Sequence, residues 1–303
     1  MTNIIKADTA INELISNYIN QADVSELSKI SYKNGLNNFI NYIEENNINA
    51  IERKNILAYK YDLLTKYTPN TVNTYLSSVR AFYEYLEVMG ISKDITKGVK
   101  GAKAPQSHAK EALTVEQTIR LLNSFDLETL TGMRDYAMLN LMINTGLRVM
   151  EVQTALVTDI AQSAGKAVLY IQGKGRDTKD NMVILEDNVL QPIREYISKR
   201  KNEQGALFQG IGNRSAGKPL SKRSISRIAK EAFISIGLDS EKITAHSTRH
   251  TAVTLSLLGG ATVQEAQAMA RHSNINTTMI YSHNINRIEN SAESKISSLL
   301  KAQ

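Results

Sequence analysis

Hydrophobic residues in the first 95 positions recur at intervals of three and four, the spacing of a helix face rather than of a strand. The clearest stripes are Ile30, Leu36, Phe39, Ile40 and Ile43, and then Val72, Leu76, Val79, Phe82, Tyr83 and Leu86. The second stripe begins after Pro69 and ends near Gly90, which are typical helix start and stop signals. We therefore predict four helices here, with the aliphatic positions forming their core.

The pattern changes after this helical region. Residues 97–110 contain Gly, Pro, small residues and four lysines but no acidic residue, which predicts a linker. Thr114 and Gln117 then have the spacing of a capping box and predict the start of a new domain. We assign residues 1–96 to a helical domain, 97–111 to the linker and 112–303 to a second domain, with a tail from about residue 284.

The second domain mixes two periodicities. Helix spacing returns at about 115–124 and 132–144, whereas 167–171 and 182–185 have the composition of short strands. The strands flank the polar segment 173–180, so they predict a hairpin with a Gly-Lys-Gly tip. The fold class expected for the whole chain is mainly α, with a mostly helical α+β second domain that carries a small hairpin sheet.

Composition narrows the classes of protein. The 303 residues are 42% hydrophobic, which is enough for real cores, and no apolar run reaches the ~18 to 20 residues of a membrane span. The first residues carry acids where a signal peptide has its apolar region, so we expect no export by that route. The absence of cysteine excludes disulfides and thiolate sites and is consistent with a cytoplasmic location.

Positive charge is concentrated in the second domain. The net charge of the chain is +6; residues 1–97 hold 10 basic and 11 acidic side chains, whereas residues 98–303 hold 26 and 19. Residues 210–230 contain six basic residues and no acidic one, and a helix is expected to begin near Ser221. The candidate phosphate contacts are Lys110 in the linker and Lys222, Arg223, Arg227 and Lys230 on that helix. A solvated helix face and a solvated tether are the alternatives.

Candidate chemistry gathers near the end of the chain. Four of the five histidines lie between positions 246 and 283, together with Arg249 and Tyr281. Guanidinium and imidazole groups are suitable donors for the oxygens of a phosphodiester under attack, and a tyrosine can supply an oxygen nucleophile once it is activated. The cluster therefore favours phosphoryl transfer.

These residues resemble the active site of the tyrosine recombinase family, which includes the phage integrases and the Xer recombinases. Residues 145–152 resemble the first-arginine box around Arg148, and Gly173-Lys174-Gly175 resembles the hairpin lysine. His246-Ser-Thr-Arg249 resembles the central box, and His272 with Tyr281 resembles the terminal pair. The helical region 1–96 is similar to the family's SAM-like core-binding domain. One departure is Ala270-Arg271 before His272, where Leu-Gly is common, and it puts the local turn geometry in question.

The resemblance implies a role for each residue. Tyr281 would attack the scissile phosphate and form a 3′-phosphotyrosyl link, while Arg148 and Arg249 hold the nonbridging oxygens. Lys174 would protonate the 5′ leaving oxygen, with Arg176 and Lys179 on the same hairpin tip as alternatives. His246 and His272 would donate hydrogen bonds, and Glu151 would orient the site. The phosphotyrosine stores the bond energy, so no metal, ATP or other cofactor is expected.

The resemblance also implies an assembly. Four protomers would act on two double-stranded DNA sites with inverted-repeat cores, through a Holliday junction, with an accessory or directionality protein as a further partner. The C-terminal segment, with Ile296, Leu299 and Leu300, would pack on a neighbouring protomer or else form a frayed helix. No arm-binding domain is expected before residue 10. Integration or excision of a mobile element and resolution of dimers use the same chemistry.

Three other functions remain open at this point. A type IB topoisomerase would use the same residues to relax DNA without joining partner strands. A DNA-binding protein without catalytic activity would keep only the basic surface. A metal-dependent integrase would need carboxylates, for which Asp177 and Asp180 make a poor pair because Lys179 lies between them.

Overall fold

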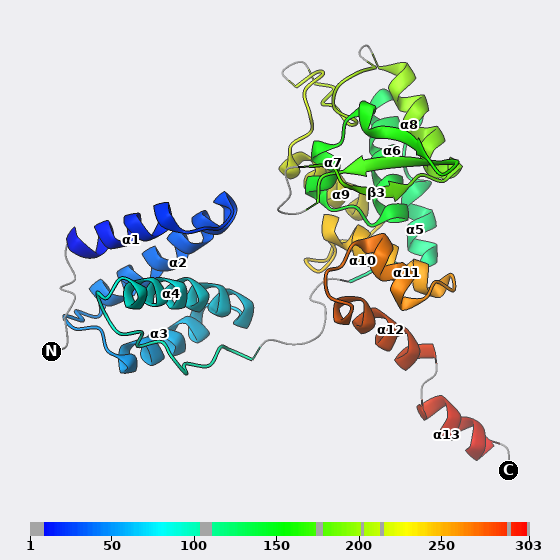
Figure 1. Cartoon of the computed structure of the whole chain (residues 1–303). Coiled ribbons are helices and arrows are strands. Elements are labelled where there is room, and N and C mark those ends of the chain that lie inside the picture. Colours follow the sequence, from blue (N-terminus) through cyan, green and yellow to red (C-terminus); the bar gives the residue numbers. More distant parts are fainter. Residues whose placement is uncertain are drawn as a thin grey trace. The chain divides into compact units, whose positions relative to one another are not determined.

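The computed structural model describes residues 9–103, 111–173, 178–200, 203–212, 215–289 and 292–301. The chain divides into two compact units, residues 1–106 and 107–303, and each unit is described below by itself. The linker and the exact domain boundaries expected from the sequence stay predictions. Figure 1 shows the helices and strands of both units.

The first unit is a bundle of four helices, the number expected from the sequence. They are α1 (Thr9–Gln21), α2 (Glu26–Glu45), α3 (Arg53–Lys66) and α4 (Pro69–Val88). The side chain of Ser25 caps the first turn of α2, and the side chain of Thr68 caps α4, which has Pro69 in its first turn. The start expected near Pro69 is thus confirmed, and its physical cause is the Thr68 cap.

The core of this unit lies mainly between α2 and α4. All six residues of the stripe from Val72 to Leu86 are buried, as are Leu36, Phe39, Ile40 and Ile43 of the other stripe. Ile30 is an exception because its side chain is 57% exposed, so its assignment to the core was wrong. Gly35 explains how α2 and α4 approach closely: a Cβ at this position would lie 2.4 Å from Oγ of Ser78.

Residues 97–102, placed in the linker from composition, run along the first unit. The Arg80 guanidinium donates to the Val99 carbonyl at 2.7 Å, and the Asn73 side chain exchanges two hydrogen bonds with the Ala102 backbone. The side chain of Val99 is buried in the same core. A single apolar residue among lysines and glycines is a weak sequence signal, which is why this contact was not foreseen.

The second unit is mostly helical. Its helices are α5 (Val115–Leu122), α6 (Leu130–Thr145), α7 (Val149–Thr154), α8 (Asp187–Lys199), α9 (Lys222–Ser235), α10 (Ala245–Leu258), α11 (Val263–Ala270), α12 (Asn276–Glu289) and α13 (Ala292–Lys301), with a 3-10 turn, η1 (Val157–Asp159). The capping box of Thr114 and Gln117 opens α5 as expected. The two predicted helices, 115–124 and 132–144, correspond to α5 and α6.

A small antiparallel sheet accompanies these helices. Its strands are β1 (Ile160–Ser163), β2 (Lys166–Ile171) and β3 (Asn181–Ile184), paired in the order β1-β2-β3. The predicted hairpin is β2 with β3, and Ile171 pairs with Asn181 at its tip. Strand β1 was not foreseen, because its four residues alternate too briefly to be told from a loop. Ala164 and Gly165, both with positive φ, turn the chain from β1 into β2.

Helix α10 is the structural centre of the second unit. It packs against α6, α9, α11 and α12, so residues far apart in the sequence meet along it (Figure 1). Its first half is buried from Ser247 to Val253. The Leu113 backbone N–H donates to the Thr251 hydroxyl at 2.9 Å, which ties the start of this unit to α10. A buried helix surrounded on several sides can hold polar side chains in fixed positions.

Helix α13 ends the described part of the chain. Its apolar residues Ile296, Leu299 and Leu300 are between 56% and 74% exposed, so they bury little surface within this chain. In the described residues, no helix is both long enough and apolar enough to cross a membrane.

Candidate active site

The turn between α6 and α7 places Arg148 and Glu151. Gly146 ends α6 in the left-handed conformation (φ 63°), and Arg148 is the N-cap residue of α7. Glu151 is buried and accepts two hydrogen bonds from Arg148, one from the backbone N–H at 2.7 Å and one from Nη1 at 2.9 Å. The carboxylate thus fixes both the start of α7 and the direction of the Arg148 side chain.

Arg249 projects from α10 toward the same turn. Its Nη1 donates to the Gly146 carbonyl at 2.6 Å, its Nη2 donates to the Ala270 carbonyl, and the residue is 3% exposed. Burial, together with the nearby charges of Arg148 and Arg271, lowers the pKa of the Arg249 guanidinium to about 10. Because nearby cations add to this shift, the site holds positive charge that an anion would balance.

Arg271 stands where the family that the sequence resembles commonly has the glycine of Leu-Gly, and the structure shows the conformation of the turn there. It ends α11 in the left-handed conformation (φ 56°, ψ 46°), the backbone state that a glycine adopts most easily. Its Nη2 donates to Glu151 Oε2 at 3.0 Å and to the Gly146 carbonyl at 3.3 Å. The turn therefore keeps a left-handed geometry without a glycine, and it brings a second guanidinium, after that of Arg148, to Glu151.

His272 follows Arg271 and is held from two directions. Its Nδ1 shares a 2.8 Å hydrogen bond with the hydroxyl of Thr278, which is fully buried on α12. Its carbonyl accepts a 3.0 Å hydrogen bond from Gln267, and its backbone N–H donates to the Gln267 carbonyl. These contacts fix the orientation of the imidazole between α11 and α12.

Tyr281 lies on α12, where it faces α10. Its side chain packs with Val253 and Ala270 and is 6% exposed, and its hydroxyl is hydrogen-bonded to Nδ1 of His250. Burial raises the pKa of the Tyr281 phenol well above its usual value, while Arg249 acts in the opposite direction. The phenol is therefore neutral at physiological pH in this conformation.

Two histidines of α10 stand next to each other. The ring centroids of His246 and His250 are 4.8 Å apart in an edge-to-face arrangement, and His250 also contacts the Tyr281 ring. His246 is exposed and His250 is buried. His250, to which the sequence analysis assigns no role, is thus a direct partner of the Tyr281 hydroxyl, a relation that spacing alone does not reveal.

A polar cleft of about 630 Å³ lies beside these residues. It is lined by Arg148, Glu151, Gly173, Asn181, Gln264, Gln267, Ala268, Arg271, His272 and Ser273. Gly173 and Asn181 belong to the two ends of the hairpin segment, so the cleft joins that segment to the arginine cluster. Its open, polar lining and positive charge are suited to an extended anion.

Two predicted residues cannot be placed. Lys174 and Lys110 lie outside the described residues, as does Arg176. Lys179, the other alternative on the hairpin, donates to Asp159 at 2.5 Å and to the Thr154 carbonyl at 3.1 Å. Because these bonds engage its ammonium group with a carboxylate, Lys179 is a poor candidate for a general acid in this conformation.

The basic residues of α9 differ in what they contact. Lys222 and Arg223 are exposed near the N-terminus of the helix, which Ser221 caps as expected. Arg227 pairs with Glu231 at 2.8 Å, and Lys230 pairs with Asp239 at 3.1 Å. Two of the four candidate phosphate contacts on α9 are therefore already paired with acidic side chains.

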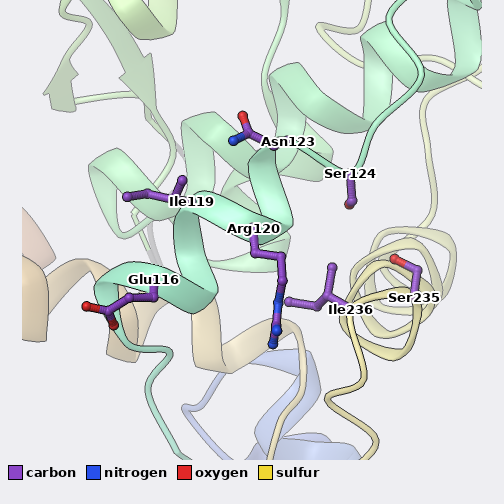
Figure 2. Close-up of a pocket in the computed structure, with 7 residues that line it drawn as sticks. All are labelled: Glu116, Ile119, Arg120, Asn123, Ser124, Ser235 and Ile236. Atoms are coloured by element: carbon purple, nitrogen blue, oxygen red, sulfur yellow. The ribbon is translucent and has the colours of Figure 1, made fainter.

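A second hollow, of about 770 Å³, lies between α5 and the end of α9 (Figure 2). Figure 2 shows its lining residues, which are Glu116, Ile119, Arg120, Asn123, Ser124, Ser235 and Ile236. It contains none of the histidines or the tyrosine, and its exposed lining is mostly apolar. We therefore place the chemistry in the arginine cleft. In the part of the chain that is described, no group of His, Asp and Glu is arranged to hold a metal ion.

Comparisons with known proteins agree with this arrangement. Residues 111–287 match the phage integrase family, and residues 11–90 match the phage integrase N-terminal SAM-like domain. The chain belongs to the phage integrase family and is a Xer-like tyrosine recombinase. The mainly α fold, with a SAM-like first domain and a small sheet in the second, is thereby confirmed.

Individual relatives span most of the chain. This chain is 29% identical over 276 residues to the tyrosine recombinase XerD of Oceanobacillus iheyensis, and the match covers 86% of this chain and 88% of the relative. It is 27% identical over 286 residues to XerD of Staphylococcus epidermidis, covering 90% and 94%.

Solved structures share the fold. The XerH site-specific recombinase, bound to palindromic difH substrate after cleavage, superposes with a TM-score of 0.69 at 18% identity, covering 97% of this chain and 92% of the other. A lambda integrase dimer bound to a COC′ core site has a TM-score of 0.66 at 17% identity, covering 88% and 96%.

Proposed function

We propose that this site-specific DNA recombinase cuts and rejoins double-stranded DNA through Tyr281. The observation that carries the proposal is the convergence of Arg148, Arg249 and Arg271 on one turn, beside a cleft that His272 also lines. Guanidinium groups held in place before the reaction stabilise the charge that develops on the nonbridging oxygens of a phosphate under attack.

In the proposed cleavage step, the phenol oxygen of Tyr281 attacks the scissile phosphorus. The bond from phosphorus to the 5′ oxygen breaks, which leaves a 3′-phosphotyrosyl link and a free 5′ hydroxyl. Arg148 and Arg249 hold the nonbridging oxygens, His246 and His272 donate hydrogen bonds and assist proton transfer, and Glu151 positions Arg148. No metal, nucleotide or other cofactor takes part in these steps.

The leaving oxygen needs a proton, and we propose Lys174 as its source. Lys174 directly follows Gly173, which lines the cleft, and the alternative Lys179 is engaged by Asp159. The phenol of Tyr281 must lose its own proton during attack. Since its hydroxyl pairs with His250 in a buried position, the hydrogen bond to His250 has to be exchanged for contact with the phosphate.

Rejoining follows by the reverse chemistry when a 5′ hydroxyl from a partner strand attacks the phosphotyrosine. We propose that four protomers exchange strands in pairs through a Holliday junction on two inverted-repeat core sites. The exposed residues Ile296, Leu299 and Leu300 of α13 would pack on a neighbouring protomer. The reaction would serve either the integration and excision of a mobile element or the resolution of dimers, and an accessory or directionality protein would select its outcome. The proposed compartment is the cytoplasm.

Contacts to the DNA backbone are assigned to the basic residues. Lys222 and Arg223 are exposed and provide the strongest contacts on α9, while Arg227 and Lys230 would first exchange their acidic partners. Lys110 would contact phosphates from the linker. These contacts are independent of sequence and add to affinity rather than to site choice.

A covalent-capture experiment tests the function. The protein is incubated with a randomised duplex library in EDTA and denatured with SDS, and only DNA that stays attached is sequenced, with Tyr281→Phe in parallel. We expect an enriched site from the wild type and none from the variant. Binding without an adduct, including on nicked substrates, would contradict cleavage; adducts and relaxed plasmid without recombinant products would favour a topoisomerase instead.

A further inference from the structure

We propose that Arg271 is a positioning residue of this active site: it shares the Glu151 carboxylate with Arg148, so that this carboxylate no longer cancels the positive charge of Arg148 beside the scissile phosphate. The inference rests on the proposed function and deepens it. Arg271 stands at a position where the family commonly has glycine. Two observations support a role for it: the hydrogen bonds around the buried Glu151 carboxylate and the left-handed backbone conformation of Arg271.

The Glu151 carboxylate is 1% exposed and lies among donors from two helices. Its Oε1 accepts from Arg148 Nη1, whereas its Oε2 accepts from the Arg148 backbone and from Arg271 Nη2 at 3.0 Å. Arg271 Nη1 also donates to the Met269 carbonyl at 2.5 Å. Arg271 therefore links the turn after α11 to the turn before α7, and it does so through the carboxylate that orients Arg148.

The backbone of Arg271 points to a purpose for its side chain. Residues other than glycine in the left-handed region are strained, by about 1 to 2 kcal/mol. Arginine keeps this conformation here (φ 56°) while its side chain is 11% exposed and its Nε has no hydrogen-bond partner among the described residues. Glycine would remove the strain, so the side chain contributes something that a glycine at this position lacks.

The Arg271 side chain contributes a positive charge that glycine lacks. Arg148 alone with Glu151 would form a neutral pair, and only Arg249 would carry net charge toward the phosphate. With Arg271 present, three guanidinium groups face one carboxylate, and the site keeps two positive charges. A phosphodiester carries one negative charge, which increases as the attacking oxygen adds. Charges held in a partly buried site act more strongly on it than charges in water.

The first test replaces Arg271 with glycine. We expect Arg271→Gly to remain folded, because relief of the backbone strain offsets part of the lost ion pair with Glu151, and to bind core DNA. Its single-turnover cleavage of a nicked substrate is expected to fall by about tenfold or more. Arg271→Lys keeps the charge and is expected to retain more activity than the glycine variant. Ala164→Gly is the matched control, because Ala164 is also left-handed (φ 49°) but lies in the β1–β2 turn.

The second test distinguishes positioning from a structural role. If Arg271 acts by neutralising Glu151, Glu151→Gln should raise cleavage in the Arg271→Gly background, although it lowers cleavage in the wild type. Cleavage by Arg271→Gly at the wild-type rate, or a further loss in the double variant, would overturn the inference. If the wild type itself forms no adduct with DNA, the proposed function fails. Failure of the inference about Arg271 is a different result, because the wild type then still forms the adduct and only the differences between the variants are absent.

Discussion

At the scale of single residues, the site is built from buried polar groups that satisfy one another. Glu151 balances Arg148 and Arg271, the carbonyl groups of Gly146 and Ala270 hold Arg249, and His250 holds Tyr281. Each of these groups would be costly to bury alone. The arrangement therefore holds these side chains in fixed positions.

The bond between Tyr281 and His250 predicts a stability effect. His250→Ala leaves the Tyr281 hydroxyl buried without this partner, so we expect unfolding of the second unit to become easier by about 2 kcal/mol. His283→Ala is the control, because His283 is exposed on the same helix as Tyr281. In chemical denaturation, the double variant with Tyr281→Phe should lose less than the sum of the single losses. Additive losses would mean that the two side chains do not interact.

The raised pKa of the Tyr281 phenol predicts a pH dependence. A tyrosine whose pKa is higher in the folded chain than its usual 10.0 keeps its proton longer when folded, so stability falls as the pH rises above about 10. Tyr281→Phe should show a smaller fall than the wild type in this range. The pKa of Arg249 shifts in the opposite direction, and because Tyr281 raises that pKa, the comparison reports the loss of Tyr281 together with its effect on Arg249. Identical pH profiles would contradict the burial of the phenol.

Sequence reasoning located this site only in part. Arg148, Arg249 and His272 could be found because their types and order match a known pattern, and the structure brings them to the same region. Arg271 could not be assigned a partner, since Glu151 lies 120 positions earlier and only the packing of α10 and α11 joins them. The partner of Tyr281 was missed for the same reason.

At the scale of elements, close packing of α2 on α4 shows what the helical pattern predicts and what it leaves open. The spacing alone identified the six buried apolar residues of α4, although not the buried Ser78. It did not reveal that Ile30 lies beyond the contact, or that Gly35 is required where the helices approach most closely. The spacing of apolar residues predicts which face of a helix is buried. Which residues along that face contact the neighbouring helix depends on the angle at which the two helices cross.

Gly35 supplies a prediction for this helix pair. A Cβ would lie 2.4 Å from Oγ and 2.7 Å from Cβ of Ser78, which is fully buried, so Gly35→Ala forces the helices apart. We expect the first unit to lose about 1 to 3 kcal/mol of unfolding free energy, measured by denaturant titration. The double variant Gly35→Ala with Ser78→Gly should recover part of the loss. Full stability of the single variant would show that the contact is not tight.

At the scale of the whole molecule, the two parts of the chain differ in net charge. The excess of basic residues lies after residue 97, in the part of the chain whose residues 111–287 match the phage integrase family. Such a distribution favours DNA contacts that depend on salt. Most of this charge could be counted from the sequence, but which cations are already paired could only be learned from the structure.

The basic helix α9 gives the corresponding prediction. Lys222→Ala and Arg223→Ala should each weaken DNA binding and reduce the slope of log affinity against log salt by about 0.9, the value for one phosphate contact. Arg227→Ala is the matched control, since Arg227 pairs with Glu231 and should change the slope less. Binding titrations at several salt concentrations measure this difference. Equal slopes for all variants would remove α9 from the interface.

The central claim is that Tyr281 becomes covalently joined to DNA, and peptide mapping tests it most directly. Trypsin cuts after Arg271 and Arg287, and the peptide of residues 272–287 contains one tyrosine, Tyr281. After capture on a nicked core site and digestion of the DNA with nuclease, mass spectrometry should find a nucleotide bound through a 3′ phosphate to Tyr281. A modified tyrosine in any other peptide, or no modified peptide from a sample that binds the site, would contradict the account.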